Sequence, residues 1–401
     1  MKTLHGGITA PLGFLAAGIA TGIKKRGIPD LALVVSERAG PIAGLFTRNR
    51  LPAAPVVLDR LHLRHRTGRA IIINSGNANA CTGPRGLADA GEMARLVARR
   101  LDARPRTVFV GSTGVIGQPL PMSCIRRGLP ILLQRLRRSG GREAARAIMT
   151  TDQRIKEIAV QDRIAGHLVT VGGMAKGAGM IHPDMATMLA FVSTDAAIAQ
   201  AALHQGLRHA VNRSFNCISV DGDTSTNDTV LCLANGMAGN PTLRAGSSGF
   251  AAFRRLLDHA CHSLAMQVCR DGEGVTKVVQ MLVVGARSPA DARRVAQVVA
   301  TSCLVKTALF GEDANWGRIM AAIGRAGVGV NPNKIGLSFD GVAIVKGGVG
   351  LGPAAERRLA KVVRRKEFTL TVDLGQGRAQ SRLWTTDLSY NYVRINASYR
   401  S

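Results

Sequence analysis

Short apolar runs that end in polar, glycine-containing turns alternate with amphipathic segments, and this alternation restricts the fold more than any other feature. Residues 70–73 form one apolar run, and apolar side chains then recur at helical spacing from Leu87 to Leu101. Residues 107–110 form the next run, which Gly-Ser-Thr-Gly closes, and a helix is expected over about 122–138. Strands that alternate with helices predict a mixed α/β or α+β fold.

The second half of the chain continues this pattern. It predicts strands at 217–220, 277–284 and 368–372, helices at 196–211 and 250–268, and a hairpin around Asp340 and Gly341. Thr194 or Asp195 is expected to cap the helix at 196–211. A length of 401 residues predicts two domains or one large layered domain, and no low-complexity linker divides the chain.

The formal net charge of +27 is high enough to suggest a polyanionic partner such as nucleic acid. The basic residues are spread out, however, in separate segments such as 64–66, 126–127, 135–138 and 364–366. Aromatic residues make up only 4% of the chain and do not interleave with the basic segments, so no stacking platform is evident. A solvated basic surface explains the charge better than a nucleic-acid partner.

The seven cysteines include no C-x-x-C pair, which argues against a disulfide framework and a structural zinc site. This usage is typical of a reducing cytoplasm. The apolar run 8–23 resembles a signal peptide, but Pro11 and three glycines interrupt it and a basic cluster follows at 24–26. We therefore expect a cytoplasmic protein, and no stretch reaches the ~18 apolar residues of a membrane span.

The stretch from Lys176 to Leu189 holds the strongest candidate for chemistry. A glycine-rich turn with one lysine leads through Pro183 to Ala186 and Thr187, at the start of an apolar run. A threonine acts as its own general base only if its α-amine is free, which requires a cut just before it. Attack of the Thr187 hydroxyl on the Ala186 carbonyl would make that cut and create an N-terminal nucleophile. By itself, the same pattern also fits the plain beginning of a buried strand.

Three further segments are candidates for a site. Residues 111–114 close a strand and could present Thr113 and Gly114 to an oxyanion. Residues 271–274 place Glu273 between glycines, where a carboxylate meets a ligand amine easily. Residues 394–401 form a polar C-terminal run. The alternatives are an ordinary turn, a solvated acidic turn and a frayed tail. Residues 221–224 resemble half of a calcium loop without the remaining ligands, so no metal is expected.

Several blocks in a fixed order resemble the ornithine acetyltransferase family of arginine biosynthesis, also called glutamate N-acetyltransferase or ArgJ. The resemblance covers nearly the whole chain. The blocks that carry it are residues 9–14, 74–83, 150–152, 176–189, 221–228, 271–274, 315–318 and 392–397. It implies a layered α/β/β/α sandwich of the DmpA/ArgJ-like type, which is a self-cleaving N-terminal-nucleophile fold.

The resemblance also implies an activity. The chain would cut itself at Ala186–Thr187 into an α chain (1–186) with the oxyanion hole and a β chain (187–401) with the nucleophile. Acetyl would pass from N2-acetylornithine to glutamate through an acetyl-Thr187 intermediate. Two α and two β chains would stay associated, and no cofactor would be needed.

Roles carry over onto matching positions. Thr187 would be the nucleophile, and Thr113 and Gly114 would form the oxyanion hole. The substrate would be bound by Thr150, Lys176, Thr187, Glu273, Asn396 and Ser401. Two positions depart from the family pattern: Asp184 replaces a common asparagine, and Ser401 replaces a common threonine.

Three alternatives stay open from the sequence. A bifunctional enzyme would also use acetyl-CoA to make N-acetylglutamate. An amidohydrolase or aminopeptidase of similar fold would pass the acyl group to water. A binding module for polyanions would rest on the net charge alone.

Overall fold

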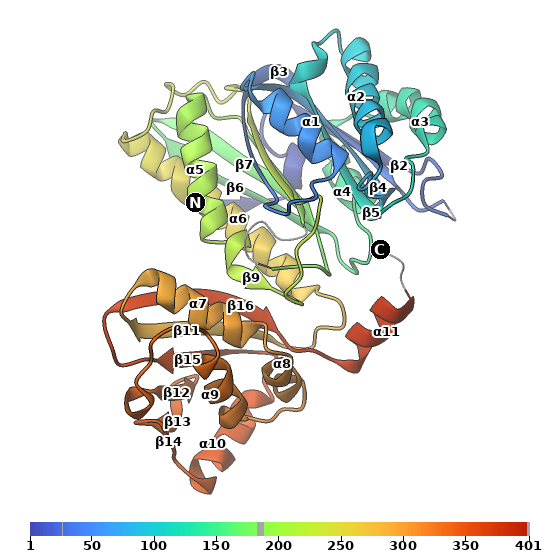
Figure 1. The fold of residues 1–401 in the computed structure, drawn as a ribbon. Coiled ribbons are helices and arrows are strands. Elements are labelled where there is room, and N and C mark those ends of the chain that lie inside the picture. The colour runs from blue at the N-terminus through green and yellow to red at the C-terminus, as the bar shows by residue number, and fades with distance from the viewer. Residues whose placement is uncertain (26, 183–187, 399–401) are drawn as a thin grey trace.

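The computed structural model describes residues 1–25, 27–182 and 188–398, and it shows a larger and a smaller body (Figure 1). The strands of the larger body are β1 (Lys2–Leu4), β2 (Phe14–Ile19), β3 (Leu31–Phe46), β4 (Thr67–Asn77), β5 (Val108–Val115), β6 (Lys156–Ile164), β7 (His167–Lys176), β8 (Leu189–Thr194) and β10 (Thr229–Ala234). Its α-helices are α1 (Ala54–Leu63), α2 (Gly83–Arg100), α3 (Met122–Gln134), α4 (Gly141–Ala147), α5 (Gln200–Asn212) and α6 (Ser248–Arg270).

The larger body is built on a sheet that has nine strands among the described residues and turns back on itself at β3. The strand order is β1-β6-β7-β8-β10-β3-β4-β5, and β2 also pairs with β3. The first half of β3 pairs with β2 and β4, whereas its second half pairs with β10. Between the halves, a Cβ at Gly40 would lie 2.0 Å from the carbonyl oxygen of Ala234. Only glycine fits at this bend, so one strand can serve both halves of the sheet.

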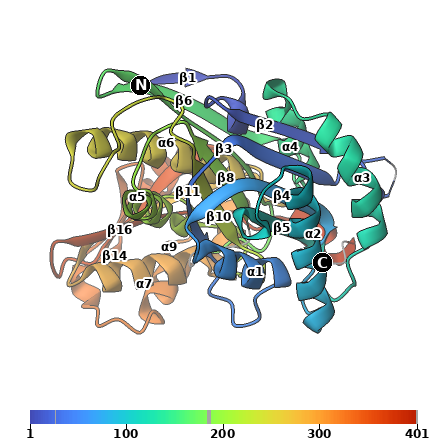
Figure 2. The ribbon, with the colours of Figure 1, turned by 90° about the horizontal axis from the view of Figure 1, so that it is seen from above.

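The two halves of the sheet pack face to face. Phe14 of β2, Ile71 of β4 and Phe109 of β5 share one buried cluster with Met174 of β7 and Phe191 of β8. A second cluster packs α5 and α6 on the outer face of the half that contains β7, β8 and β10, and a third packs α2 and α3 on the opposite outer face. Figure 2 shows these helix pairs on opposite sides of the strands. The order of layers is α/β/β/α, which confirms the predicted fold class.

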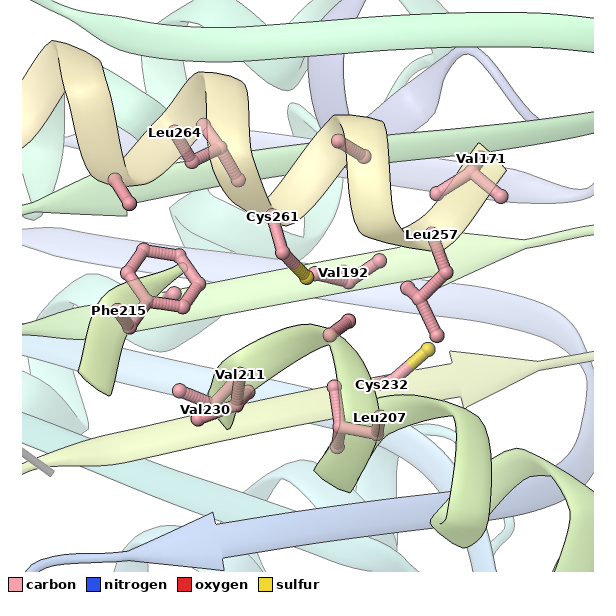
Figure 3. Packing of buried hydrophobic residues seen from close by; sticks show 14 of the residues in the cluster. Val171, Val192, Leu207, Val211, Phe215, Val230, Cys232, Leu257, Cys261 and Leu264 are labelled. Carbon is pink, nitrogen blue, oxygen red and sulfur yellow. The ribbon is translucent and has the colours of Figure 1, made fainter. Parts of the chain in front are cut away.

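The side chains of β8 alternate between two hydrophobic cores. Successive side chains of a strand point to opposite faces. Phe191 accordingly lies in the core between the two halves of the sheet, whereas Val192 faces the helices. Figure 3 shows Val192 below Leu257, Cys261 and Leu264, which α6 contributes at helical spacing. The continuous apolar run after residue 187 is therefore typical of a strand that is buried on both faces.

The smaller body has its own sheet and its own core. The sheet order is β14-β13-β12-β15-β11-β16-β9, and the core is a separate buried cluster. Its strands are β9 (Ile218–Ser219), β11 (Val278–Ala286), β12 (Gly336–Phe339), β13 (Val342–Lys346), β14 (Val349–Gly350), β15 (Glu367–Asp373) and β16 (Ala379–Thr386). Its helices are α7 (Pro289–Ala300), α8 (Cys303–Phe310), α9 (Trp316–Gly324) and α10 (Pro353–Val363), and α11 (Tyr390–Ser398) then returns toward the larger body (Figure 1).

The strands on the two sides of the predicted cut are neighbours. β7 and β8 pair antiparallel, with Lys176 opposite Leu189. The Ala186–Thr187 bond itself lies outside the described residues. The packing divides the chain near residue 277 instead, because β11 begins the second core.

Two local expectations were wrong. The helix expected at 196–211 begins later, at Gln200, because Thr194 ends β8 and the Asp195 carboxylate accepts backbone N–H groups of Leu12 and Thr170. The helix expected to reach residue 138 ends at Gln134, and a short 3₁₀ turn follows at Arg138–Gly140. The polar C-terminal run is helical as α11 up to Ser398.

All seven cysteines are free thiols. Within the described ranges, we find no helix that combines the length and the apolar character needed to cross a bilayer.

Phe191→Ala tests the core between the two halves of the sheet. The ring is fully buried, so its removal should lower the free energy of unfolding by about 3–5 kcal/mol through lost burial and a residual cavity. Urea denaturation followed by circular dichroism measures the change. Leu304→Ala, at a side chain that is 61% exposed, should change stability by less than about 0.5 kcal/mol. Equal effects of the two variants would contradict this packing.

Candidate active site

A cavity of about 390 Å³ lies where several strand ends and loops meet. Its lining includes the six predicted site residues that the structure describes, namely Thr113, Gly114, Thr150, Lys176, Glu273 and Asn396. These residues come from β5, the segment before β6, the end of β7, the loop after α6, and α11. Ala186, Thr187 and Ser401 lie outside the described residues. Chain connectivity places Thr187 directly before Met188, which is buried at the start of β8.

The backbone conformation and the close packing near the end of β5 require glycine at position 114. Its φ is +132°, and a Cβ there would lie 2.3 Å from the carbonyl carbon of Gly76 on β4. The polar loop 221–228 is tied to the same place by Asn227, whose side-chain amide donates to the carbonyls of Ala78 (2.6 Å) and Ser112 (2.8 Å). The backbone around Thr113 and Gly114 is therefore held in one geometry, as an oxyanion site requires.

Lys176 is the positive charge of the cavity. Its side chain is 4% exposed, and its Nζ donates to the Thr113 hydroxyl over 3.1 Å. Burial lowers the pKa of Lys176, and Asp152 is the group that opposes this shift most strongly. A buried ammonium next to a threonine hydroxyl suits a ligand carboxylate or a developing oxyanion.

Asp152 stabilises the part of the cavity around Lys176. Its carboxylate accepts hydrogen bonds from the backbone N–H groups of Thr150 (2.9 Å) and Gly177 (2.7 Å) and from Lys156 Nζ (2.5 Å). Burial would raise the pKa of Asp152, but Lys176 and Lys156 outweigh it and lower that pKa to about 2. Lys156 is also fully buried and forms a second ion pair with Asp271 at 2.6 Å.

Glu273 and Asn396 also line the cavity and contact each other. Asn396 Nδ2 donates to Glu273 Oε2 over 2.9 Å, which connects α11 to the loop after α6. The Glu273 backbone N–H donates to the Ala178 carbonyl over 2.8 Å. A Cβ at Gly179 would lie 2.4 Å from Glu273 Oε2, so the glycine-rich turn gives this carboxylate its space.

Asp221 and Tyr392 line the cavity and were not predicted as site residues. The Asp221 carboxylate accepts the backbone N–H groups of Met180 (2.6 Å) and Ile181 (2.9 Å), and the Tyr392 hydroxyl donates to it over 3.4 Å. Burial, with a smaller contribution from Asp223, raises the pKa of Asp221 to about 6. The sequence signal was the acidic start of the block 221–228, which belongs to the family resemblance but otherwise resembles only an incomplete calcium loop.

The cavity is lined by charges of both signs. Lys176 lies beside Thr113, and the carboxylates of Asp221 and Glu273 also line the cavity. This arrangement fits a small molecule that carries both a carboxylate and an amine. Among the residues that the structure describes, no three His, Cys, Asp or Glu side chains are grouped to hold a metal ion.

These features define a layered α/β/β/α protein with an enzyme-like pocket of amino-acid size. The model of the ArgJ family matches residues 15–401, and the chain belongs to this family. It is 52% identical to the arginine biosynthesis bifunctional protein ArgJ of Geobacter sulfurreducens, over 97% of this chain and 99% of that protein. It is 49% identical to the ArgJ of Symbiobacterium thermophilum over the full length of both chains.

A solved structure of ArgJ from Bacillus halodurans is similar as well. It shares 42% sequence identity with this chain and superposes with a TM-score of 0.50. The match covers 98% of the solved chain but only 52% of this chain, so the solved chain is about half as long.

Asp152→Asn tests the buried charge network. The variant keeps the side-chain size but leaves Lys156 and Lys176 without their shared carboxylate. The free energy of unfolding at pH 7 should fall by about 3–5 kcal/mol, because an uncompensated charge stays buried. Since folding lowers the pKa of Asp152 from 3.8 to about 2, its stabilisation is present above about pH 4 and is lost as the pH falls toward 2.

Urea unfolding of wild type and variant at pH 7, 5 and 3 measures this difference, which should shrink at pH 3. Glu367→Gln, which removes a half-exposed ion pair with Arg270, is the control and should cost less than about 1 kcal/mol. A loss in Asp152→Asn that is no larger than in this control would show that the buried network contributes little.

Proposed function

We propose that this chain is an acetyltransferase of arginine biosynthesis that moves an acetyl group from N2-acetylornithine to glutamate. The observation that carries the proposal is the convergence of the six described site residues, from five separate segments, on one cavity. Membership of the ArgJ family and the names of the relatives support the same activity.

The proposed reaction has two half-reactions on Thr187. Its free α-amine accepts the hydroxyl proton while the oxygen attacks the acetyl carbonyl of the donor. Thr113 and Gly114 stabilise the oxyanion, and the Lys176 ammonium beside Thr113 supports them. Collapse of the intermediate leaves acetyl-Thr187 and releases ornithine. The amine of glutamate then attacks this ester and leaves as N-acetylglutamate.

The remaining site residues bind the amino-acid part of the substrates in this proposal. Lys176 and the hydroxyl groups of Thr150 and Ser401 receive the carboxylate. Glu273, oriented by Asn396, receives the substrate amine through a charge-assisted hydrogen bond. Charges of both signs line the cavity, which suits a substrate that carries both a carboxylate and an amine.

Self-cleavage at Ala186–Thr187 is part of the proposal. It gives an α chain of residues 1–186 and a β chain of residues 187–401. The half-length chain of the Bacillus halodurans structure supports such a division. We further propose that two α and two β chains assemble into one cytoplasmic enzyme that needs no cofactor.

The relatives are called bifunctional, and this name favours a second activity. The same acetyl-Thr187 ester would then also form from acetyl-CoA. Purified enzyme is assayed with glutamate and either N2-acetylornithine or acetyl-CoA as donor. Transfer from N2-acetylornithine is expected whether the enzyme has one activity or two. Turnover with acetyl-CoA identifies the bifunctional form. Release of free acetate without glutamate would identify an amidohydrolase instead.

Thr187→Ala tests the cleavage. Wild-type protein should separate into two fragments on denaturing electrophoresis, with intact masses that correspond to residues 1–186 and 187–401. The variant should stay a single chain without acetyl transfer, because both cleavage and acetyl transfer require the hydroxyl. An uncleaved wild type with full activity would overturn the proposed function.

Glu273→Gln tests the proposed amine-binding carboxylate. It removes a charge-assisted hydrogen bond of about 1.5–3 kcal/mol. The KM for N2-acetylornithine should therefore rise about tenfold to a hundredfold, with a smaller change in kcat. Steady-state kinetics of the cleaved variant measure both constants, and Glu367→Gln serves as the charge-matched control on the smaller body. An unchanged KM would exclude Glu273 from substrate binding.

A further inference from the structure

A second cavity, of about 490 Å³, is built from segments that also form the active-site cavity. These segments are the residues before β6, the loop after α6, and α11, and they contribute Thr150, Glu273 and Asn396 to the active site. The side chains that line the second cavity have no role in the transfer of acetyl from N2-acetylornithine described above.

Neighbouring residues of these segments line different cavities. Glu273 lines the active-site cavity, whereas Gly272 and Gly274 on either side of it line the second cavity. In the segment before β6, Thr151 lines the first cavity and Arg154 the second. Since consecutive Cα atoms are only about 3.8 Å apart, the two cavities adjoin at these segments.

Helix α11 divides its side chains between the two cavities. Residues three or four positions apart lie on the same face of a helix. Tyr392 and Asn396 accordingly line the active-site cavity, and Asn391, Arg394 and Ile395 line the second cavity. The helix that brings Asn396 to the active site therefore also brings a guanidinium group to the cavity beside it.

Arginine side chains dominate the charge of the second cavity. Arg154, Arg270 and Arg394 all line it. Arg270 is held by Glu367 through two hydrogen bonds of 2.7 and 3.1 Å. Arg154 and Arg394 are exposed, and within the part of the chain that the structure describes their guanidinium groups form no ion pair.

The acidic residue of this lining does not neutralise them. Asp271 Oδ2 already accepts hydrogen bonds from Lys156 Nζ (2.6 Å) and from the backbone N–H groups of Gln153 (3.0 Å) and Arg154 (3.1 Å). Two guanidinium groups are thus available to an anion that is not part of the chain. The planar guanidinium group matches phosphate oxygens particularly well.

We propose that Arg154 and Arg394 bind the phosphate groups of acetyl-CoA, the donor of the second activity. This inference rests on the proposed function and adds a subsite for one of its two donors. Acetyl-CoA carries its acetyl group and its phosphate groups at opposite ends of a long chain, so it suits two adjoining cavities. N2-acetylornithine has no phosphate group and does not use this subsite.

The test compares the two donors in Arg154→Gln, Arg394→Gln and the double variant, with glutamate as acceptor. Each single substitution should raise the KM for acetyl-CoA by about fivefold to tenfold, because one guanidinium–phosphate contact is lost. The kcat should stay within about twofold, since this contact is the same in the ground state and the transition state. The KM for N2-acetylornithine should also stay within about twofold, which shows that the variants are folded.

Arg358→Gln is the matched control, since it removes the same charge from an exposed residue of α10 on the smaller body. It should leave both KM values unchanged. Acetyl-pantetheine, which has the same thioester but no phosphate group, distinguishes phosphate binding from a structural effect. Its KM should be the same in wild type and in the variants of Arg154 and Arg394.

An unchanged KM for acetyl-CoA in the double variant would overturn the inference, and so would an equal rise for acetyl-pantetheine. Wild type that uses N2-acetylornithine but not acetyl-CoA would also overturn it and would leave the first activity intact. Failure of the proposed function gives a different result, in which wild type transfers acetyl from neither donor, and the inference then fails with it.

Discussion

The antiparallel pairing of β7 with β8 is the constraint on which the rest of the site depends. Its register sets Lys176, the last residue of β7, opposite Leu189, the first residue of β8. A glycine-rich turn leaves β7 at that end, and the segment with Thr187 enters β8 there. Lys176 is therefore held beside the start of β8 by a sheet that is buried on both faces. A shift of this register by one residue would exchange the two faces of β8 and disrupt both cores.

Four buried charges near the cavity form a chain in which positive and negative groups alternate. Lys176 lies near Asp152, Asp152 pairs with Lys156, and Lys156 pairs with Asp271 at the start of the loop that carries Glu273. Removing such charges from water costs several kcal/mol each, so the chain of pairs persists only with good geometry. Backbone N–H groups of Thr150 and Gly177 complete the coordination of Asp152. The network thus connects Lys176 of the cavity to the loop that carries Glu273.

The sequence predicted the parts of this molecule that depend on local pattern. The strands β4, β5, β11 and β15, the helices α2 and α6, and the turn around Asp340 follow from apolar periodicity and turn residues. The sequence did not predict the cap of α5, because the Asp195 carboxylate accepts hydrogen bonds from the backbone N–H groups of Leu12 and Thr170. Both residues are distant from Asp195 in the chain. It also did not predict Asp221 or Tyr392 at the cavity, since their meeting depends on the position of α11. Propensity cannot report such long-range contacts.

Each proposed fragment carries part of the site. The two fragments must therefore stay together after the cut. Thr113, Gly114, Thr150 and Lys176 precede it, whereas Glu273 and Asn396 follow it. The β7–β8 ladder and the core that contains Met174 and Phe191 both cross the cut. The backbone hydrogen bonds of this ladder and the apolar contacts of this core do not require a covalent bond between residues 186 and 187. A cut between these residues can therefore leave the described groups of the site together, and this is the property that an N-terminal nucleophile needs.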